Sequence, residues 1–213
     1  MSLPTDSPGS AGEHALQDEY GTADRAARFY SDQVRDRLLP RMIEFLERAE
    51  MLFVATADGS GGCDSSLRAG PPGFVRVLDD RTLAYPEYRG NGVHASLGNI
   101  SENPHVGLFT VDLERDLIGL HVNGGATILD DAEFRSRYPE AAVDPGRGPQ
   151  AERWVLVDVH EAYLHCRKHI PRMQRVDQER AWGTDDPGRK GGDYFRVKGT
   201  PTGAEAHAVT GSA

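Results

Sequence analysis

The residues best suited to bind a charged ligand lie in the stretch 63–104, where arginines, serines and glycines stand between apolar runs. Arg89 directly precedes a Gly-Asn-Gly sequence at 90–92, and a short helix is predicted over 91–103. A phosphate needs charge-assisted hydrogen-bond donors, and the planar guanidinium of an arginine offers two parallel N–H groups. Glycines let the backbone approach an anion closely. The first turn of a helix adds free N–H groups. The pattern therefore predicts phosphate binding around Arg89, with a surface turn capped by Asn91 as the alternative.

A second arginine, Arg68, stands between a predicted strand and a Gly-Pro-Pro-Gly segment at 70–73. Taken alone, an arginine in such a place is more often a surface side chain than a ligand-binding group. The segment that follows either lets a ligand approach the backbone or forms a bulge in the strand. These residues by themselves leave both alternatives open.

Metal binding and nucleophilic catalysis find little support in the sequence. His165 and His169 flank Cys166 at a spacing of four, which needs a helix, and the cysteine is no clear third ligand. We therefore predict no metal site. None of the serines, cysteines or histidines has the context of an activated nucleophile, so the catalytic residues stay unassigned.

The composition is that of an acidic protein long enough for one domain with a hydrophobic core. The 213 residues carry a formal net charge of -9, which argues against nucleic-acid or anionic-membrane partners. An anion site must then be a local basic pocket. The chain has two cysteines, no apolar signal segment and no apolar run of about 18 residues, which predicts a cytoplasmic protein.

The spacing of apolar residues predicts the elements that must position these side chains. Helices are expected after Ser10, which forms a capping box with Glu13, after Thr22, and from Pro40 in a first helical turn. Strands are predicted at 51–57, 63–67, 73–78, 82–85, 105–112, 117–129 and 153–166, and another helix at 131–138. The run at 73–78 is interpreted as the resumption of the strand at 63–67 after the prolines. About six antiparallel strands with a few helices indicate a small barrel.

The chain is expected to form a single domain over residues 13–198, with flexible tails at 1–12 and 199–213. Charged and glycine-rich residues surround Trp182, so its segment is predicted to be a loop. The tryptophan is interpreted either as part of a lid over a site or as an anchor for the tail.

Three longer motifs carry a resemblance to a known family. They are RAGPPGFVRVLD at 68–79, YPEYRGNG at 85–92 and HCRKHIPR at 165–172. By these motifs the chain resembles the pyridoxamine 5′-phosphate oxidase-like proteins, which have an FMN-binding split barrel. The likeness extends from the helix before Met51 to Cys166. It implies a mainly β (α+β) fold, a six-stranded antiparallel split barrel with flanking helices.

The resemblance also implies an FMN-dependent oxidoreductase that acts on a small molecule. Members of the family are homodimers with two flavins at the subunit interface, and F420 is the alternative cofactor. Their second strand supplies an arginine to the flavin, and the third strand with its following loop holds the phosphate. Carried over to this chain, the resemblance implies as cofactor-binding residues Ser66, Arg68, Arg76, Tyr85, Pro86, Arg89, Asn91, Gly92, Lys168 and Arg172.

This chain departs from the oxidases proper at two points. They carry an Arg-x-Val-Leu-Leu-Lys run where this chain has Pro71-Pro72, and their substrate-holding Trp and Arg have no clear counterpart among Trp182, Arg189 and Arg196. Oxidation of pyridoxamine phosphate is therefore not implied. Two other interpretations stay open. One is a protein of the same fold that holds flavin, F420 or haem without turnover, and the other is a barrel kept for dimerisation with a vestigial site.

Overall fold

The computed structural model describes residues 8–142, 151–176, 186 and 188–199. By its internal contacts the chain divides into two units, Met1–Val176 and Asp177–Ala213. The first unit contains every labelled helix and strand and every candidate cofactor-binding residue named above. Trp182 lies outside the described residues, so its two interpretations stay open. The expected tail and domain boundaries also stay a prediction.

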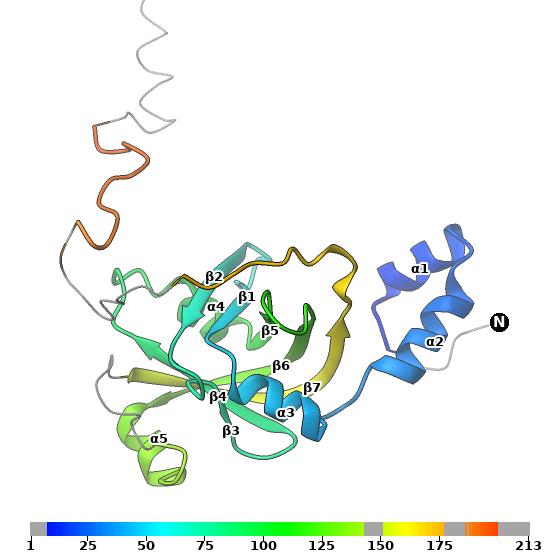
Figure 1. Cartoon of the computed structure of the whole chain (residues 1–213), viewed down its shortest axis with the longest axis horizontal. Coiled ribbons are helices and arrows are strands. Elements are labelled where there is room, and N and C mark those ends of the chain that lie inside the picture. Colours follow the sequence, from blue (N-terminus) through cyan, green and yellow to red (C-terminus); the bar gives the residue numbers. More distant parts are fainter. Residues whose placement is uncertain (1–7, 143–150, 177–185, 187, 200–213) are drawn as a thin grey trace, which may run out of the picture. The chain divides into compact units, whose positions relative to one another are not determined.

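Seven antiparallel strands form one sheet in the order β2-β1-β5-β6-β7-β4-β3 (Figure 1). Their bounds are β1 Met51–Ala57, β2 Cys63–Ala69, β3 Arg76–Val77, β4 Thr82–Tyr88, β5 His105–Val111, β6 Gly119–Asp130 and β7 Ala151–His165. Side chains alternate between the two faces of such strands. In β1, Leu52, Val54 and Thr56 are buried, whereas Phe53 and Ala55 are exposed. At β1, one face of the sheet therefore packs into a core and the other stays accessible.

The helices cover parts of this sheet to different degrees. They are α1 Ala11–Glu19, α2 Ala23–Gln33, α3 Pro40–Glu47, α4 Ala95–Glu102 and α5 Asp131–Arg137, with a single 3₁₀ turn at Arg167–His169. Ser10 Oγ accepts a hydrogen bond from Glu13 N at 3.2 Å, but the side chain of Thr22 makes no cap bond. Helix α3 buries Phe45 and Leu46. Neither α1 nor α2, both fully described, contains a buried residue.

Strand β4, which leads into the candidate site, packs against hydrophobic residues on both of its faces. Leu83 and Tyr85 belong to the main core, whereas Ala84 belongs to a second cluster beside α5. In that cluster Phe134 stacks on Trp154 with 4.0 Å between ring centroids. Aromatic pairs of this kind contribute about 1 kcal/mol beyond the area they bury. The end of β4 is therefore anchored by rigid neighbours.

The prediction that the run at 73–78 resumes the second strand is wrong. β2 ends at Ala69 on one edge of the sheet, whereas β3 pairs with β4 at the other, so the sheet has seven strands rather than six. Pro71-Pro72 offers no N–H to a ladder, and Phe74 N donates to Pro71 O at 2.9 Å to close a turn. A Cβ on Gly70 would lie 2.5 Å from the Phe74 side chain, so only glycine fits beneath that ring.

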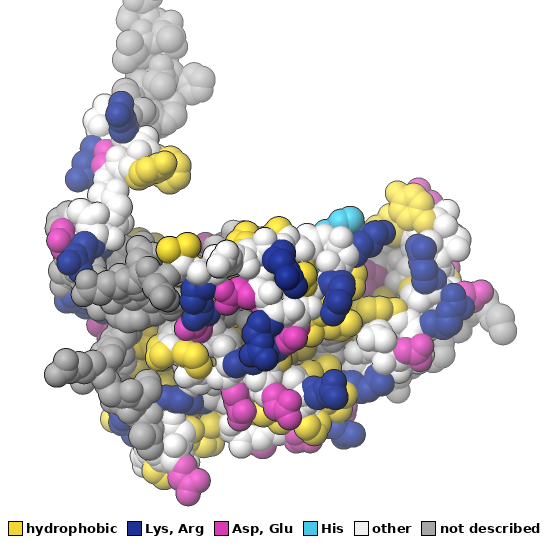
Figure 2. Space-filling view, viewed as in Figure 1, with side chains coloured by type: hydrophobic (Ala, Val, Ile, Leu, Met, Phe, Trp, Pro, Cys, Tyr) yellow, Lys and Arg dark blue, Asp and Glu magenta, His cyan; other side chains and the backbone are white. Residues whose placement is uncertain are grey.

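The surface seen in Figure 2 mixes charges of both signs, with Lys and Arg interspersed among Asp and Glu. That face therefore has no continuous basic patch, in agreement with the net charge of -9. Among the helices of the described ranges, none is long and apolar enough to cross a membrane.

Candidate functional site

The end of β4 continues into a loop, residues 89–94, that leads to the first turn of α4. The side chain of Asn91 accepts a hydrogen bond at 3.0 Å from the backbone N–H two residues later. Gly92 has a φ of 83° and His94 a φ of 56°, both in the left-handed region. The helix therefore begins at Ala95, four residues later than the sequence predicted. The first N–H groups of such a helix have no partner within it.

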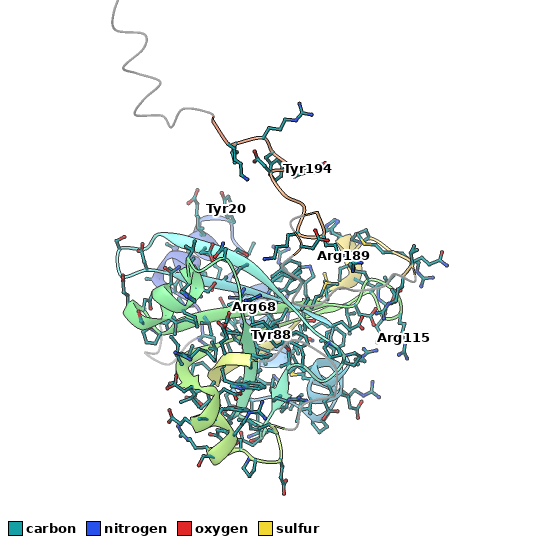
Figure 3. All side chains as sticks on the ribbon, turned by 90° about the vertical axis from the view of Figure 1, so that its left-hand side faces the viewer. Tyr20, Arg68, Tyr88, Arg115, Arg189 and Tyr194 are labelled. Atoms are coloured by element: carbon teal, nitrogen blue, oxygen red, sulfur yellow. The ribbon has the colours of Figure 1, made fainter. Side chains whose placement is uncertain are left out.

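A pocket of about 440 Å³ lies where this loop and the start of α4 face strand β2. We call it the α4 pocket. Its size falls within the range of about 300–1,000 Å³ that is typical of small-molecule sites. Its described lining residues are Asp64, Ser66, Leu67, Arg68, Ala69, Glu87, Tyr88, Gly90, Asn91, Gly92, Val93, His94, Ala95, Ser96 and Leu97. Figure 3 labels Arg68 and Tyr88, which come from the strands β2 and β4.

The central charged contact of the pocket is the pair Arg68–Glu87. Arg68 Nε donates to Glu87 Oε1 at 2.7 Å, and Arg68 Nη2 lies 2.7 Å from the same oxygen. The two side chains are only 17% and 12% exposed, so the pair is largely removed from water. Burial raises the pKa of Glu87, and the hydrogen bond and charge of Arg68 counteract that rise.

A chain of hydroxyl groups connects this pair to α4. Arg68 Nη1 donates to Ser66 Oγ at 3.0 Å, and Ser66 Oγ lies 2.9 Å from Ser96 Oγ. Ser96 Oγ in turn donates to Asp64 Oδ2 at 3.2 Å. Because Asp64, Ser66 and Arg68 alternate along β2, all three project toward the side that α4 covers. The network fixes the orientation of the guanidinium and of both hydroxyls.

Tyr85 contributes a buried hydroxyl behind the pocket. The residue is fully buried, and among the described residues its Oη has no hydrogen-bond partner. Burial raises the pKa of Tyr85, and the charges that act on it most are those of Glu87, which adds to the rise, and Arg68, which opposes it. The phenol is therefore protonated and lies within electrostatic range of the pair.

The structure brings four of the ten predicted residues together in the α4 pocket: Ser66, Arg68, Asn91 and Gly92. Tyr85 and Pro86 lie buried in β4 behind it, and Arg89 lies in the exposed part of the loop. Arg76 lies in β3, where its Nη1 donates to Gly73 O. Lys168 and Arg172, exposed residues after β7, are not among the described lining residues. The roles of all ten residues as cofactor ligands stay predictions.

Sequence reasoning missed four polar side chains that line the pocket: Asp64, Glu87, His94 and Ser96. Two signals could have found some of them. Asp64 stands two and four residues before Ser66 and Arg68, which is the spacing of one strand face. Glu87 stands within the YPEYRGNG motif, two residues before Arg89.

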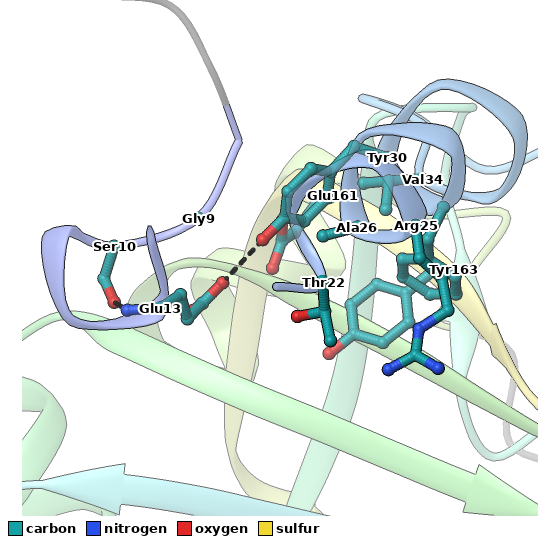
Figure 4. Close-up of a pocket in the computed structure, with 11 residues that line it drawn as sticks. Gly9, Ser10, Glu13, Thr22, Arg25, Ala26, Tyr30, Val34, Glu161 and Tyr163 are labelled. Carbon is teal, nitrogen blue, oxygen red and sulfur yellow. Dashed lines mark hydrogen bonds between the residues drawn. The ribbon is translucent and has the colours of Figure 1, made fainter. Parts of the chain in front are cut away.

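A second hollow lies between the N-terminal helices and β7, and we call it the N-terminal groove (Figure 4). Its volume is about 820 Å³, larger than that of the α4 pocket. It is lined by Gly9, Ser10, Glu13, Thr22, Arg25, Ala26, Phe29, Tyr30, Val34, Glu161 and Tyr163. Tyr30 Oη donates to Glu13 Oε2 at 3.0 Å and accepts from Gln17 at 2.8 Å.

Comparison of the sequence with models of known protein families shows which family the chain belongs to. The family model described as pyridoxamine 5′-phosphate oxidase matches residues 38–166, more than half of the chain. The chain belongs to this family. The family match contains the whole sheet and both walls of the α4 pocket, whereas α1 and α2 lie before it. The predicted class, a mainly β (α+β) antiparallel split barrel, is confirmed, with seven strands in place of six.

Several solved structures are similar to this family member in fold. HupZ of Group A Streptococcus, solved as a tagged variant, is 23% identical, covers 60% of this chain and 98% of its own, and has a TM-score of 0.47. An F420 reductase is 20% identical over 57% of this chain and 93% of its own, with a TM-score of 0.38. HutZ, a haem storage protein from Vibrio cholerae, is 16% identical over 60% and 93%, with a TM-score of 0.38. No curated protein matches the chain.

The described residues contain no group of three or more His, Cys, Asp or Glu side chains that could hold a metal ion. The polar groups of the α4 pocket are instead hydroxyls, backbone N–H groups, the largely buried Arg68–Glu87 pair, and the side chains of Asp64, Asn91 and His94. This set can bind an oxygen-rich anion and one end of a flat polar ring.

Proposed function

We propose that the chain binds FMN in the α4 pocket and transfers electrons or a hydride between this flavin and a small-molecule substrate. The observation that carries the proposal is the convergence of Arg68, two serine hydroxyls, the Gly-Asn-Gly loop and the first turn of α4 on one cavity. Kinship with a family described as an oxidase supports the same assignment.

The donor set fits a phosphate monoester. One guanidinium, two serine hydroxyls and the N–H groups at the start of α4 are hydrogen-bond donors gathered in one pocket, where Arg68 now donates to Glu87 and Ser96 to Asp64. A Cβ built on Gly90 or Gly92 meets nothing within 4 Å, so the loop leaves open space at that point. A phosphate can therefore approach the backbone there without displacing protein atoms.

Apolar side chains at the rim fit the flat ring of the cofactor. Val93 in the loop is 70% exposed and Leu97 lies in the first turn of α4, and both line the pocket. Bound flavin would supply the redox chemistry through its ring system. The task of the chain is then to hold the ring, to offer hydrogen bonds to its carbonyl edge and to exclude water from one face.

We further propose that a second copy of the chain covers the accessible face of the sheet. Five side chains lie opposite one another across β2, β1, β5, β6 and β7, and we call them the aromatic row: Leu67, Phe53, Phe109, His121 and Tyr163. His121 and Phe109 have 4.7 Å between their centroids, and His121 stacks on Tyr163 at 4.8 Å. Leu67 is 54% and Phe53 38% exposed, and an exposed apolar row of this kind is a surface that a second copy of a chain can cover.

Ligand identification tests the proposed function directly. We expect the purified full chain to carry FMN or to bind added FMN with a flavin absorption spectrum, and mass spectrometry of the released ligand to give the mass of FMN. Release of F420 or haem would support the alternative of a binding protein for those groups. Reduction of bound FMN by NAD(P)H followed by reoxidation with a substrate separates an oxidoreductase from a flavin carrier. A colourless protein that binds no added FMN contradicts the proposal.

A further inference from the structure

Glu87 occupies an unexpected place for a carboxylate in an anion-binding pocket. Its Oε1 accepts a hydrogen bond from Nε of Arg68 and lies 2.7 Å from Nη2, so one whole edge of the guanidinium faces this residue. Nη1 is engaged with Ser66 Oγ. An arginine binds a phosphate best through the same kind of edge. The carboxylate therefore holds the position at Arg68 that a phosphate would take.

The charges around the α4 pocket oppose a second anion. Among its described lining residues, the charged side chains are Arg68, Asp64 and Glu87, together with the titratable His94. With His94 neutral, one positive charge stands against two negative charges. A phosphate dianion that enters this pocket is repelled by the carboxylate of Glu87, which lies beside the guanidinium that would bind the phosphate. Such a juxtaposition of like charges disfavours binding, most strongly in a partly desolvated site.

We propose that Glu87 is a resident counter-anion of Arg68, and that a phosphate ester binds at Arg68 with uptake of one proton by Glu87. The proton comes from the solvent and is added to the carboxylate, which becomes a neutral carboxyl group. The full charge of Arg68 is then available to the phosphate. Only the identity of the ester, FMN, rests on the proposed function.

The surroundings of Glu87 favour this exchange. Arg68 faces it from β2, Tyr85 from its own strand β4 and His94 from the start of α4, with Asp64 further along β2. Burial already raises the pKa of Glu87 in the unliganded protein, and Arg68 is the chief group that opposes the rise. A phosphate adds negative charge and takes part of the hydrogen bonding of Arg68. Both effects move the pKa of the carboxyl further upward.

Calorimetry in pairs of buffers tests the exchange, because the difference in buffer ionisation heats counts the protons taken up on binding. At about pH 7, we expect FMN to bind wild-type protein with more proton uptake than the Glu87→Gln variant shows. We also expect Glu87→Gln to bind FMN about tenfold more tightly, since the competing charge is gone while the shape stays. Riboflavin, which has no phosphate, is expected to bind both proteins equally well.

Two further variants separate this role from a general charge effect or a folding defect. Asp64→Asn also removes one negative charge from the pocket, but Asp64 is bonded to Ser96 and not to Arg68. Its gain in FMN affinity should therefore be clearly smaller. In an Arg68→Gln background, Glu87→Gln should no longer change FMN affinity. Thermal melting of each variant shows that the protein tested is folded.

Equal proton uptake by wild type and Glu87→Gln, or weaker FMN binding by Glu87→Gln, overturns the inference and leaves the flavin assignment standing. If neither FMN nor riboflavin binds, the proposed function fails. The inference is then decided with inorganic phosphate, whose stabilising effect on the melting temperature must be larger in Glu87→Gln than in wild type and Asp64→Asn. The absence of that difference overturns it as well.

Discussion

The α4 pocket is about half as large as the N-terminal groove, 440 Å³ against 820 Å³, but its walls are held far more firmly. Five of its polar side chains form one connected network that joins β2, β4 and α4, and Ser96 within it is buried. The groove is lined mainly by α1 and α2, which bury no residue of their own. Ligand binding needs side chains that are already in position. The α4 pocket is therefore the better candidate for a ligand site, because its hydrogen-bond donors are already in position, although its volume is smaller.

The chemistry of the two hollows differs as well. The groove places the carboxylates of Glu13 and Glu161 near the phenols of Tyr30 and Tyr163 (Figure 4). Burial raises the pKa of both tyrosines, so both phenols are protonated, and Tyr30 donates a hydrogen bond to Glu13. The α4 pocket also contains two carboxylates, but there Glu87 is paired with Arg68, Asp64 is bonded to Ser96, and the first turn of a helix adds backbone N–H groups. Changes in the pocket should therefore alter the binding of an anion, and changes in the groove should not.

Replacing Arg68 should have the largest effect. Arg68→Ala is expected to weaken FMN binding roughly 100-fold, because it removes the charge-assisted donors. It also leaves Glu87 largely buried without its partner, so the free energy of unfolding at about pH 8 should fall by about 3 kcal/mol. Calorimetry and denaturant unfolding measure the two effects. Arg25→Ala in the N-terminal groove is the matched control, and a similar loss of FMN affinity there would break the contrast between the hollows.

A change of backbone in the loop should have the next largest effect. Gly92 has a φ of 83° with open space around it, so Gly92→Ala brings strain rather than collision. We expect a loss of about 1 kcal/mol in stability and a several-fold loss in FMN affinity, because the loop N–H groups move. Gly61→Ala, at a φ of 91° in the β1–β2 turn, carries the same strain outside the pocket. It should lower stability to a similar extent and leave FMN affinity unchanged.

The pH dependence of stability sharpens the role of Glu87. Its pKa is higher in the folded than in the unfolded protein, so between these two values the folded state binds more protons. The stability contributed by this group is therefore fully present below the unfolded pKa and is lost as the pH rises through the folded pKa. From about pH 7 down to about pH 4, near the unfolded pKa, the melting temperature of wild type should improve relative to that of Glu87→Gln. A constant difference between the two across this range contradicts the raised pKa.

The smallest effect is expected in the groove. Tyr30→Phe removes the hydroxyl that bonds to Glu13 and Gln17, and the exposed setting limits the loss of stability to about 0.5–1 kcal/mol. FMN affinity should stay within error of wild type by calorimetry. A change of FMN affinity in this variant would show that the groove and the pocket are coupled.

Local sequence patterns predicted most of the elements because they depend on neighbours in the chain. The strand at 51–57 and the helix beginning at Pro40 occur as expected, since alternation and a proline in the first turn act locally. The predicted start of α4 is four residues too early because His94 adopts a left-handed conformation, which is uncommon for residues other than glycine. The run at 73–78 was misassigned because pairing partners across a sheet are not encoded in one strand alone.

The sequence by itself determined the kind of donors near Arg68 and the glycine-rich loop, since residue type sets charge and backbone freedom. It could not determine that Glu87 reaches Arg68, because the two side chains stand 19 residues apart and meet only when β2 and β4 flank the same helix start. Nor could it separate Arg76 from Arg68, which alternation alone would place on one continued strand. Tertiary structure decided both points, because the Pro-Pro kink sends the chain from one edge of the sheet to the other.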